Sequence, residues 1–269
     1  MQKGIDFIIV IFYRFGYAQI LTESIKKYVK NIPYTINIVN NGINTGDNNG
    51  FDILKDMFKN ESNVNVLAGM EQTIDSNVAN PNTYVCKHDG RKVSIGSHAK
   101  AVAMKEALLN SNREYVCYLD ADTIFLDEWV DDIIPLLEDN YFVSHKWRED
   151  IQMDGNNFCI VKRKTLDENY LYEQGDLYPN LHYKDSNGML AYWALSKKKP
   201  FAILPNSYEN PELKSHHVLK LDYGEQSWIN DKPIFYHHGR GSTRADELYI
   251  NWIKTTSKYL GIDFEDIRL

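Results

Sequence analysis

The chain has 269 residues, of which 43% are hydrophobic and 25% charged, as in ordinary soluble proteins with a buried core. A formal net charge of −7 gives no general basis for binding nucleic acid or an anionic membrane surface. Three cysteines without CxxC spacing argue against a disulfide framework, and no apolar run approaches the roughly 18 residues of a membrane span. We therefore expect a soluble cytoplasmic protein in a reducing compartment.

The first half of the chain alternates apolar strands with amphipathic helices. Strands are expected over 7–12, 36–39, 64–67 and 115–119, and helices over 20–28, 51–58 and 98–109. This order of strand, helix and strand predicts a parallel sheet with a ligand crevice at the carboxyl ends of its strands. The polar segment 70–95 lacks periodicity, and its length is typical of a functional loop or lid.

The second half is less regular. Further strands are expected over 141–143, 158–161, 201–205 and 233–236, and helices over 188–195 and 245–260. In the last helix, Tyr249, Trp252 and Tyr259 either cap the core or dock a partner, and the oligomeric state is left open. We expect one α/β domain over 1–242, with halves 1–125 and 126–242, and a helical extension over 243–269 packed on it.

Two carboxylates follow the strand expected over 115–119, in the sequence Asp120-Ala121-Asp122. On an extended backbone, alternation would place both side chains on the same side. Such carboxylates repel each other unless a cation lies beside them. Oxygen ligands suit Mg²⁺ or Mn²⁺ that bridges phosphates, whereas the alternative is a solvated strand end.

The order of these motifs resembles the GT-A fold nucleotide-sugar glycosyltransferases, nearest to the inverting family 2. The resemblance rests on Asn40-Asn41-Gly42 after the second strand, Gly96-Ser97-His98 before a helix, and Asp120-Ala121-Asp122-Thr123. It covers residues 5–130 well and 141–240 more loosely. It implies a Rossmann-like mixed sheet flanked by helices, and a metal-dependent enzyme that moves a sugar, with inversion, from a nucleoside-diphosphate sugar to a hydroxyl of a glycan or other acceptor. Asp120 and Asp122 would hold Mn²⁺ or Mg²⁺.

The resemblance also implies contacts with the donor nucleotide. Tyr13 would stack on the base and Arg14 would pair with a phosphate, unless they are packing and surface residues. The family usually has an acid at the position of Asn40, and the amide can pair with a base edge or simply form a turn.

Further donor contacts are implied around the paired carboxylates and at the start of the helix before them. Asp120 and Ala121 would contact the cofactor, and a helix amino terminus attracts anions such as a pyrophosphate. Ser97, His98 and Lys100 would reach it. The alternative is that Ser97 caps the helix while His98 faces solvent.

Two adjacent histidines, His237 and His238, precede Gly239-Arg240-Gly241. In many related enzymes a histidine near this place completes the metal ligands, and imidazole would favour Mn²⁺ over Mg²⁺. Neighbours on a strand face opposite ways, so only one histidine is expected to bind metal. His238 is preferred narrowly because the glycine follows it directly. Arg240 would neutralise phosphate charge, and the second pair, His216-His217, is expected at the surface.

The catalytic base implied by the resemblance is Asp185, which aligns with the acid of the family's motif. Lys184 replaces the usual first acid, and Asp185 is also suited to be a helix N-cap. Asp154 is the second candidate, and an enzyme that retains configuration would need no such base. Three aromatic residues form either an acceptor platform or, as we favour, core packing: Trp147, Tyr183 and Trp193.

Two other classes of protein fit part of the pattern. A sugar-1-phosphate nucleotidyltransferase would need a glycine-rich basic loop after the first strand, but Phe12-Tyr13-Arg14-Phe15-Gly16 has a single glycine. A non-catalytic homologue would bind nucleotide-sugar or glycan without turnover.

Overall fold

The computed structural model describes residues 1–12, 14–40, 49–68, 83–85, 92–94, 100, 103–105, 107–148, 153–154, 157–169, 188–239 and 245–269. A seven-stranded sheet in the order β12-β8-β11-β6-β1-β2-β3 forms its centre. Four of its strands are parallel: β1 (Gln2–Ile11), β2 (Tyr34–Asn40), β3 (Val64–Ala68) and β6 (Arg113–Asp120). Beyond β6, the strands β11 (Phe158–Lys162) and β8 (Phe142–Ser144) alternate in direction, and β12 (Ala202–Ile203) runs parallel to β8.

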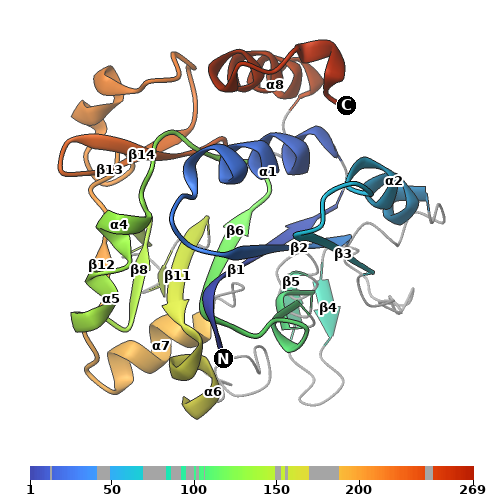
Figure 1. Ribbon diagram of the computed structural model, residues 1–269. Helices are drawn as coiled ribbons and strands as arrows, with labels where there is room; N and C mark the ends of the chain where they lie inside the picture. The colour runs from blue at the N-terminus through green and yellow to red at the C-terminus, as the bar shows by residue number, and fades with distance from the viewer. Residues whose placement is uncertain are drawn as a thin grey trace.

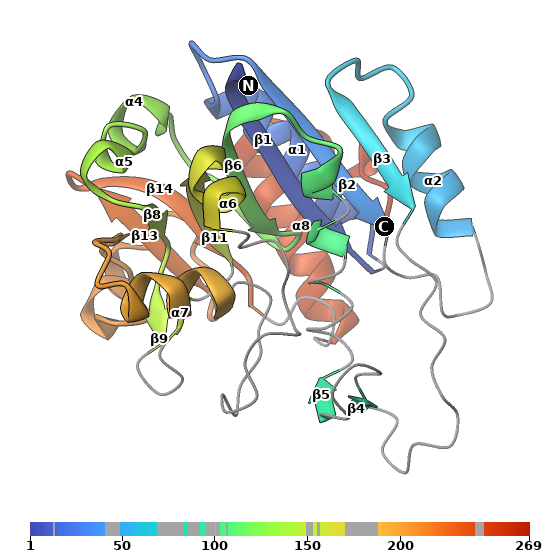
Figure 2. The same ribbon diagram turned by 90° about the horizontal axis from the view of Figure 1, so that it is seen from below.

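Helices cover both faces of this sheet (Figures 1 and 2). One face carries α1 (Gly16–Tyr28) and α2 (Asn49–Met57). The other carries α6 (Arg163–Asn169), α7 (Gly188–Ser196) and the helical residues 103–105 and 107–109.

The sheet has two separate cores because its side chains alternate. On β1, Phe7 and Ile9 pack with α1, whereas Ile8 and Val10 pack on the opposite face with residues of α6 and α7. The mixed α/β fold expected from the sequence is therefore confirmed.

A second sheet lies beside the first and contains β7 (Thr123–Phe125), β14 (Lys232–His237) and β13 (Glu225–Ile229). All its pairings are antiparallel. Phe125 on β7 stacks on Trp129, with ring centroids 5.0 Å apart. Both side chains belong to the hydrophobic core on the α1 side of the large sheet.

Apart from the C-terminal helix, the remaining described elements are short. They are α4 (Val130–Ile133), α5 (Leu136–Asp139), the antiparallel pairs β4 (Thr83–Val85) with β5 (Lys92–Ser94) and β9 (Trp147–Arg148) with β10 (Met153–Asp154), and the 3₁₀ helices η2 (Pro211–His216) and η3 (Phe264–Asp266).

The last long helix, α8 (Asp246–Leu260), packs on the outer side of α1 (Figure 1). Its buried Tyr249 and Trp252 contact Tyr17 of α1 through tilted ring pairs. It ends at Gly261, whose φ of +79° is the left-handed conformation common after a helix. Of the two expectations for this helix, capping of the core is the one that the structure shows for Tyr249 and Trp252.

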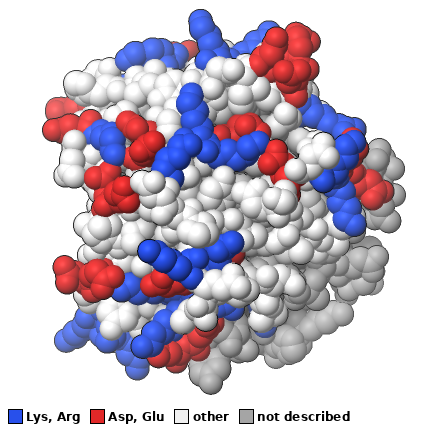
Figure 3. Space-filling view, viewed as in Figure 1, with Lys and Arg blue, Asp and Glu red and all other residues white. Residues whose placement is uncertain are grey.

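The cysteines and the charged side chains were considered in the sequence and can now be placed in the structure. Cys117 and Cys159 are buried free thiols. Basic and acidic side chains are interspersed over the face shown in Figure 3. No helix among the described residues combines the length and apolar character needed to cross a membrane.

Candidate metal centre and active site

The two paired carboxylates lie at a turn between the two sheets. Asp120 is the last residue of β6, the chain turns at Ala121 and Asp122, and β7 begins at Thr123. The Thr123 hydroxyl donates to the Asp120 carbonyl over 2.6 Å, which closes this turn. The expectation of an extended backbone here is therefore wrong, because a turn, and not strand alternation, sets the directions of the two side chains.

His237 completes a compact group with these carboxylates. It is the last residue of β14 and pairs with Thr123 of β7, which places it next to the turn. Its Nε2 atom lies 3.4 Å from Asp122 Oδ1 and 3.8 Å from Asp120 Oδ2. One ligand atom from each residue lies within 4.8 Å of the others. Two carboxylates and an imidazole so arranged form a donor set that suits a divalent cation.

The ionisation of His237 reflects its surroundings. Burial by itself would lower its pKa, but the nearby carboxylates of Asp122, Glu225 and Asp120 outweigh burial and raise the pKa to about 9. The His237 ring and the Lys100 ammonium, which forms an ion pair with Asp120 Oδ1, both face the two aspartates. The site therefore attracts positive charge, as a cation site requires.

His238 lies on the other side of the strand. Its Nδ1 atom is 2.7 Å from the Tyr17 hydroxyl, and its ring stacks on Trp252 with centroids 4.8 Å apart. The expectation that only one of the two histidines faces the carboxylates agrees with this arrangement. The preference for His238 as that residue does not: His237 faces Asp120 and Asp122, because the pairing of β14 with β7 fixes which residue points toward the turn.

Arg14 and Asn40, which were predicted to contact the donor nucleotide, both lie against neighbouring helices. Arg14, with a φ of +67°, donates to Asp246 Oδ1 over 2.9 Å and lies 5.0 Å from the centre of the Tyr249 ring, both in α8. Asn40 ends β2 and is buried, and a Cβ added to Gly50 would lie 3.3 Å from its Nδ2 atom. A glycine therefore lets α2 begin directly against Asn40. The nucleotide roles of Arg14 and Asn40 stay predictions.

Several predicted site residues lie outside the described part of the chain. They are Tyr13, Ser97, His98, Tyr183, Asp185 and Arg240, and the side chains of Trp147 and Asp154 lie outside it as well. Ala121 is partly buried in the turn.

Two secondary expectations can be compared directly with the structure. Trp193 is buried and packs edge-on against Tyr141, with ring centroids 5.0 Å apart, so the packing interpretation is confirmed. His217 was expected at the surface with its neighbour. His216 is exposed, but the expectation for His217 is wrong: it is buried, and its Nε2 atom is 2.8 Å from the Ser207 hydroxyl.

Sequence reasoning missed a second polar group behind His237. Glu225 begins β13 directly opposite His237 on β14, and its Oε2 atom lies 2.7 Å from Lys146 Nζ and 3.2 Å from His145 Nε2. A signal for this strand is present in the sequence. Asn230-Asp231 has the composition of a two-residue hairpin turn, and both residues have positive φ, 49° and 63°.

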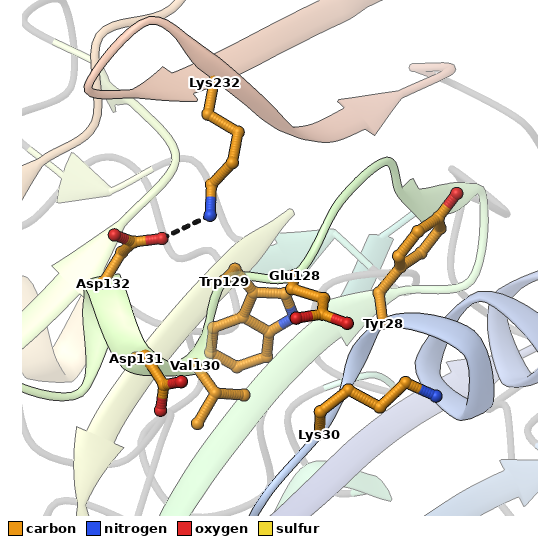
Figure 4. Close-up of a pocket in the computed structure, with 8 residues that line it drawn as sticks. All are labelled: Tyr28, Lys30, Glu128, Trp129, Val130, Asp131, Asp132 and Lys232. Carbon is orange, nitrogen blue, oxygen red and sulfur yellow. Dashed lines mark hydrogen bonds and ion pairs between the residues drawn. The ribbon is translucent and has the colours of Figure 1, made fainter.

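A small cavity of about 70 Å³ lies at the opposite end of β14 (Figure 4). Lys232, the first residue of β14, forms an ion pair there with Asp132, and Trp129 lies in the middle of the lining. Because His237 is the last residue of the same strand, this cavity is separate from the carboxylate turn.

Comparison with known proteins supports the fold. No family model matches the chain, and no curated protein does. Among solved structures, the apo form of the glycosyltransferase GlyE of Streptococcus pneumoniae TIGR4 is similar at a TM-score of 0.51 and 12% identity, over 99% of this chain and 62% of that chain. TarS of S. aureus, residues 1–349, is similar at a TM-score of 0.46 and 12% identity, over 95% and 65% of the two chains. The mannosyltransferase PcManGT of Pyrobaculum calidifontis, in complex with GDP-Man and Mn²⁺, is similar at 0.48 and 11%, over 76% and 55%.

The similarity to GlyE confirms the resemblance to glycosyltransferases at the level of the fold. The chain spans less than two thirds of the length of each of these three structures. At this identity a shared fold does not carry over an activity.

Proposed function

We propose that this chain is a metal-dependent glycosyltransferase that transfers a sugar from a nucleoside-diphosphate sugar to an acceptor hydroxyl. One observation supports this proposal above the others. Asp120, Asp122 and His237 converge at the carboxyl end of a parallel strand, where open α/β sheets bind their ligands, in a fold shared with a glycosyltransferase.

The three side chains fit Mn²⁺ by the chemistry of their donors. Carboxylate oxygens suit Mg²⁺ and Mn²⁺ alike, whereas an imidazole nitrogen favours the softer of the two. A bound cation would act as Lewis acid and template, and would offset the charge of the leaving diphosphate. Asp122 and His237 are almost fully buried, with residue exposures of 8% and 6%, so their positions are set by packing before a ligand arrives.

Lys100 supplies a second positive charge at this edge. It pairs with Oδ1 of Asp120, while Oδ2 of the same carboxylate is the atom nearer to His237. One carboxylate can therefore serve a cation and a lysine through different oxygens. In the proposed reaction Lys100 would bind the diphosphate, and Asp120, Asp122 and His237 would hold the metal.

The acceptor side of the proposal rests on the sequence. Asp185 would take the proton from the acceptor hydroxyl as the sugar is transferred with inversion, and Asp154 is the second candidate for this role. A positioned base of this kind contributes roughly 10²–10⁴-fold to the rate. Replacement of Asp185 by Asn should remove that factor from kcat and leave donor affinity unchanged.

The test of the proposal is calorimetric binding of a panel of UDP-, GDP- and TDP-sugars, with and without Mn²⁺. We expect one nucleotide to bind to the wild type only with Mn²⁺ and not to bind measurably to Asp122→Ala. The matched control is Asp131→Ala, which removes an exposed carboxylate of α4. Asp131 lines the cavity beside Lys232, at the opposite end of β14 from His237. It should bind like the wild type.

Three results would separate the alternatives. If no nucleotide bound with or without Mn²⁺, the glycosyltransferase proposal would be wrong, and Asp120 and Asp122 would have only a structural role at the turn. Formation of pyrophosphate from a sugar-1-phosphate and a nucleoside triphosphate would indicate a nucleotidyltransferase. Metal-dependent binding of a nucleotide sugar, without hydrolysis or transfer to any acceptor, would indicate the non-catalytic homologue.

A further inference from the structure

A row of polar residues crosses the three-stranded sheet at the metal centre. Thr123 on β7, His237 on β14 and Glu225 on β13 are paired in register, so successive members lie directly opposite one another. Cross-strand neighbours of this kind have their side chains on the same face of a sheet. Glu225 therefore lies behind His237, on the side away from Asp120 and Asp122.

The two ring nitrogens of His237 point toward different carboxylates. Nε2 faces Asp122 and Asp120, whereas Nδ1 lies 3.6 Å from Oε2 of Glu225. The latter is an ion-pair distance, slightly longer than a hydrogen bond. The imidazole thus lies between the two aspartates of the proposed metal site and the carboxylate of Glu225.

Glu225 is itself held firmly in place. Lys146 Nζ lies 3.0 Å from Oε1 and 2.7 Å from Oε2, and His145 Nε2 lies 3.2 Å from Oε2. His145 is fully buried, and its Nδ1 atom is hydrogen-bonded to the Ser227 hydroxyl. Burial lowers the pKa of His145 to about 4 despite the neighbouring carboxylate, so this histidine is neutral and donates from Nε2.

We infer that Glu225 is the positioning residue for His237: it accepts the Nδ1 proton, so that the Nε2 lone pair points at the cation held with Asp120 and Asp122. This inference rests on the proposed function, because it needs His237 to be a metal ligand. A metal-bound histidine must be neutral and must carry its proton on the other nitrogen. A carboxylate acceptor fixes that tautomer, orients the ring and makes the ligand nitrogen more basic.

The same geometry argues against Glu225 as a ligand of a second cation. His145, Glu225 and His237 also present ligand atoms within 4.8 Å of one another. However, the Lys146 ammonium lies within hydrogen-bond distance of both oxygens of Glu225 and supplies the positive charge there. Glu225 is therefore arranged as an acceptor of protons on nitrogen.

Asn157 is the competing partner of His237. Its Nδ2 atom lies 2.8 Å from Nδ1. An amide that donates to Nδ1 would leave the proton of a neutral ring on Nε2, facing Asp120 and Asp122. The amide can turn about its last torsion and present Oδ1 instead, so Asn157 and Glu225 are alternative acceptors for the same proton. Their contributions have to be separated by experiment.

The experiment measures Mn²⁺ affinity of the full chain by electron paramagnetic resonance of the free ion, in the presence of the nucleotide that the wild type binds. Glu225→Gln keeps the shape of the side chain and removes its charge. We expect it to weaken Mn²⁺ binding by about 10- to 100-fold, the usual effect of losing a partner of a metal-bound histidine. The matched control is Glu138→Gln, which removes an exposed carboxylate paired with Lys162 and should leave Mn²⁺ affinity unchanged.

A second variant guards against misfolding, because Glu225→Gln leaves the Lys146 ammonium buried beside a neutral amide. The double variant Glu225→Gln, Lys146→Met removes both charges together, and such joint replacement of a buried pair is much better tolerated than loss of one partner. It should show the same loss of Mn²⁺ affinity. Nitrogen-15 spectra of the Zn²⁺-loaded wild type give an independent measure and should show His237 protonated on Nδ1.

The outcomes are distinct for the two proposals. If the wild type binds Mn²⁺ and both Glu225 variants bind it equally well, the inference is overturned while the proposed function stands. Loss of affinity in Asn157→Leu but not in the Glu225 variants would assign the acceptor role to Asn157 and also overturn the inference. If the wild type fails to bind Mn²⁺ with any nucleotide, the proposed function and the inference fall together.

Discussion

The two sides of strand β14 at its carboxyl end differ in the charge and polarity of the side chains that they face. On one side, His237 lies between Asp122 and Glu225, and oxygen atoms face both of its ring nitrogens. On the other side, His238 stacks on Trp252 and also lies beside the Tyr223 ring, with centroids 4.7 Å apart. Two histidines next to each other in the sequence therefore have opposite surroundings: His237 lies among charged side chains, and His238 lies among aromatic rings.

The comparison shows that two adjacent histidines can have different surroundings and need not share one function. Successive side chains of a strand point to opposite faces of the sheet. The charges on each face then determine what each imidazole can do. An imidazole among carboxylates can exchange its proton for a metal ion, whereas one packed among aromatic rings contributes through contact area. Four predictions follow the difference between the two sides.

The largest effect is expected on the aromatic side. Trp252→Ala should lower the free energy of unfolding by about 3–5 kcal/mol, because it removes a fully buried indole from the layer between α1 and α8. Denaturant titration measures this change. Leu109→Ala, at a residue that is 57% exposed, should change stability by about 0.5 kcal/mol or less. Equal effects of the two substitutions would show that α8 is not part of the folded core.

A pH effect of similar size is expected on the polar side. Burial lowers the pKa of His145 from 6.5 to about 4, so between these values the unfolded chain binds a proton that the folded chain does not. The free energy of unfolding should therefore fall as the pH falls from about 6.5 to about 4, by on the order of 3 kcal/mol. Urea titrations at several pH values measure the slope, which should be shallower in His145→Asn. The slope of His216→Asn, at an exposed histidine, should match the wild type.

The next effect separates the two adjacent histidines. His237→Gln should weaken Mn²⁺ binding by about 100-fold, at least the loss seen when only the partner of a metal-bound histidine is removed. His238→Gln should bind Mn²⁺ like the wild type and lose stability instead, because it breaks the stack on Trp252 and the contact with Tyr17. Calorimetric titration with MnCl₂ distinguishes the two, and the reverse result would return the ligand role to His238.

The smallest effect concerns Lys100. Lys100→Met should lower the affinity for the donor nucleotide by roughly 10-fold at saturating Mn²⁺, as expected for the loss of one charge-assisted hydrogen bond. Mn²⁺ alone should bind no more weakly, because the ammonium that pairs with Asp120 has been removed. Lys164→Met, at an exposed lysine of α6, is the control. A loss of Mn²⁺ affinity in Lys100→Met would show that the lysine supports the metal centre and does not bind the diphosphate.

Much of the fold could be predicted from the sequence because its signals are local. The apolar run of β1 and the strand before Asp120 are continuous and buried, and α1 and α8 have clear apolar faces. The expected sheet, its parallel half and the position of the paired carboxylates are confirmed. The short strands β7 and β13 were missed, because each is defined by pairing with β14 and has little pattern of its own.

The choice between His237 and His238, and the role of Glu225, depended on register. A two-residue turn at Asn230-Asp231 pairs Ile229 with Lys232, and uninterrupted pairing would place Glu225 opposite Tyr236. A bulge between Ser227 and Trp228 shifts the register by one residue and brings Glu225 opposite His237. No local pattern in the sequence announces this bulge, so the polar row could be found only in the folded chain.

The packing of α8 and of the residues after it on α1 has a consequence for synthesis in the cell. Gln19 of α1 donates to the Asp266 carbonyl over 2.9 Å and accepts from the Arg268 amide over 3.0 Å, a sequence separation of 249 residues in the second case. At about 5–20 residues per second, a ribosome needs roughly 10 to 50 seconds to pass from one partner to the other. During that interval the outer face of α1, including Tyr17 and Ile20, has no partner from α8. This side of α1 is thus covered only after α8 has been synthesised, and until then its apolar residues are a natural target for a chaperone.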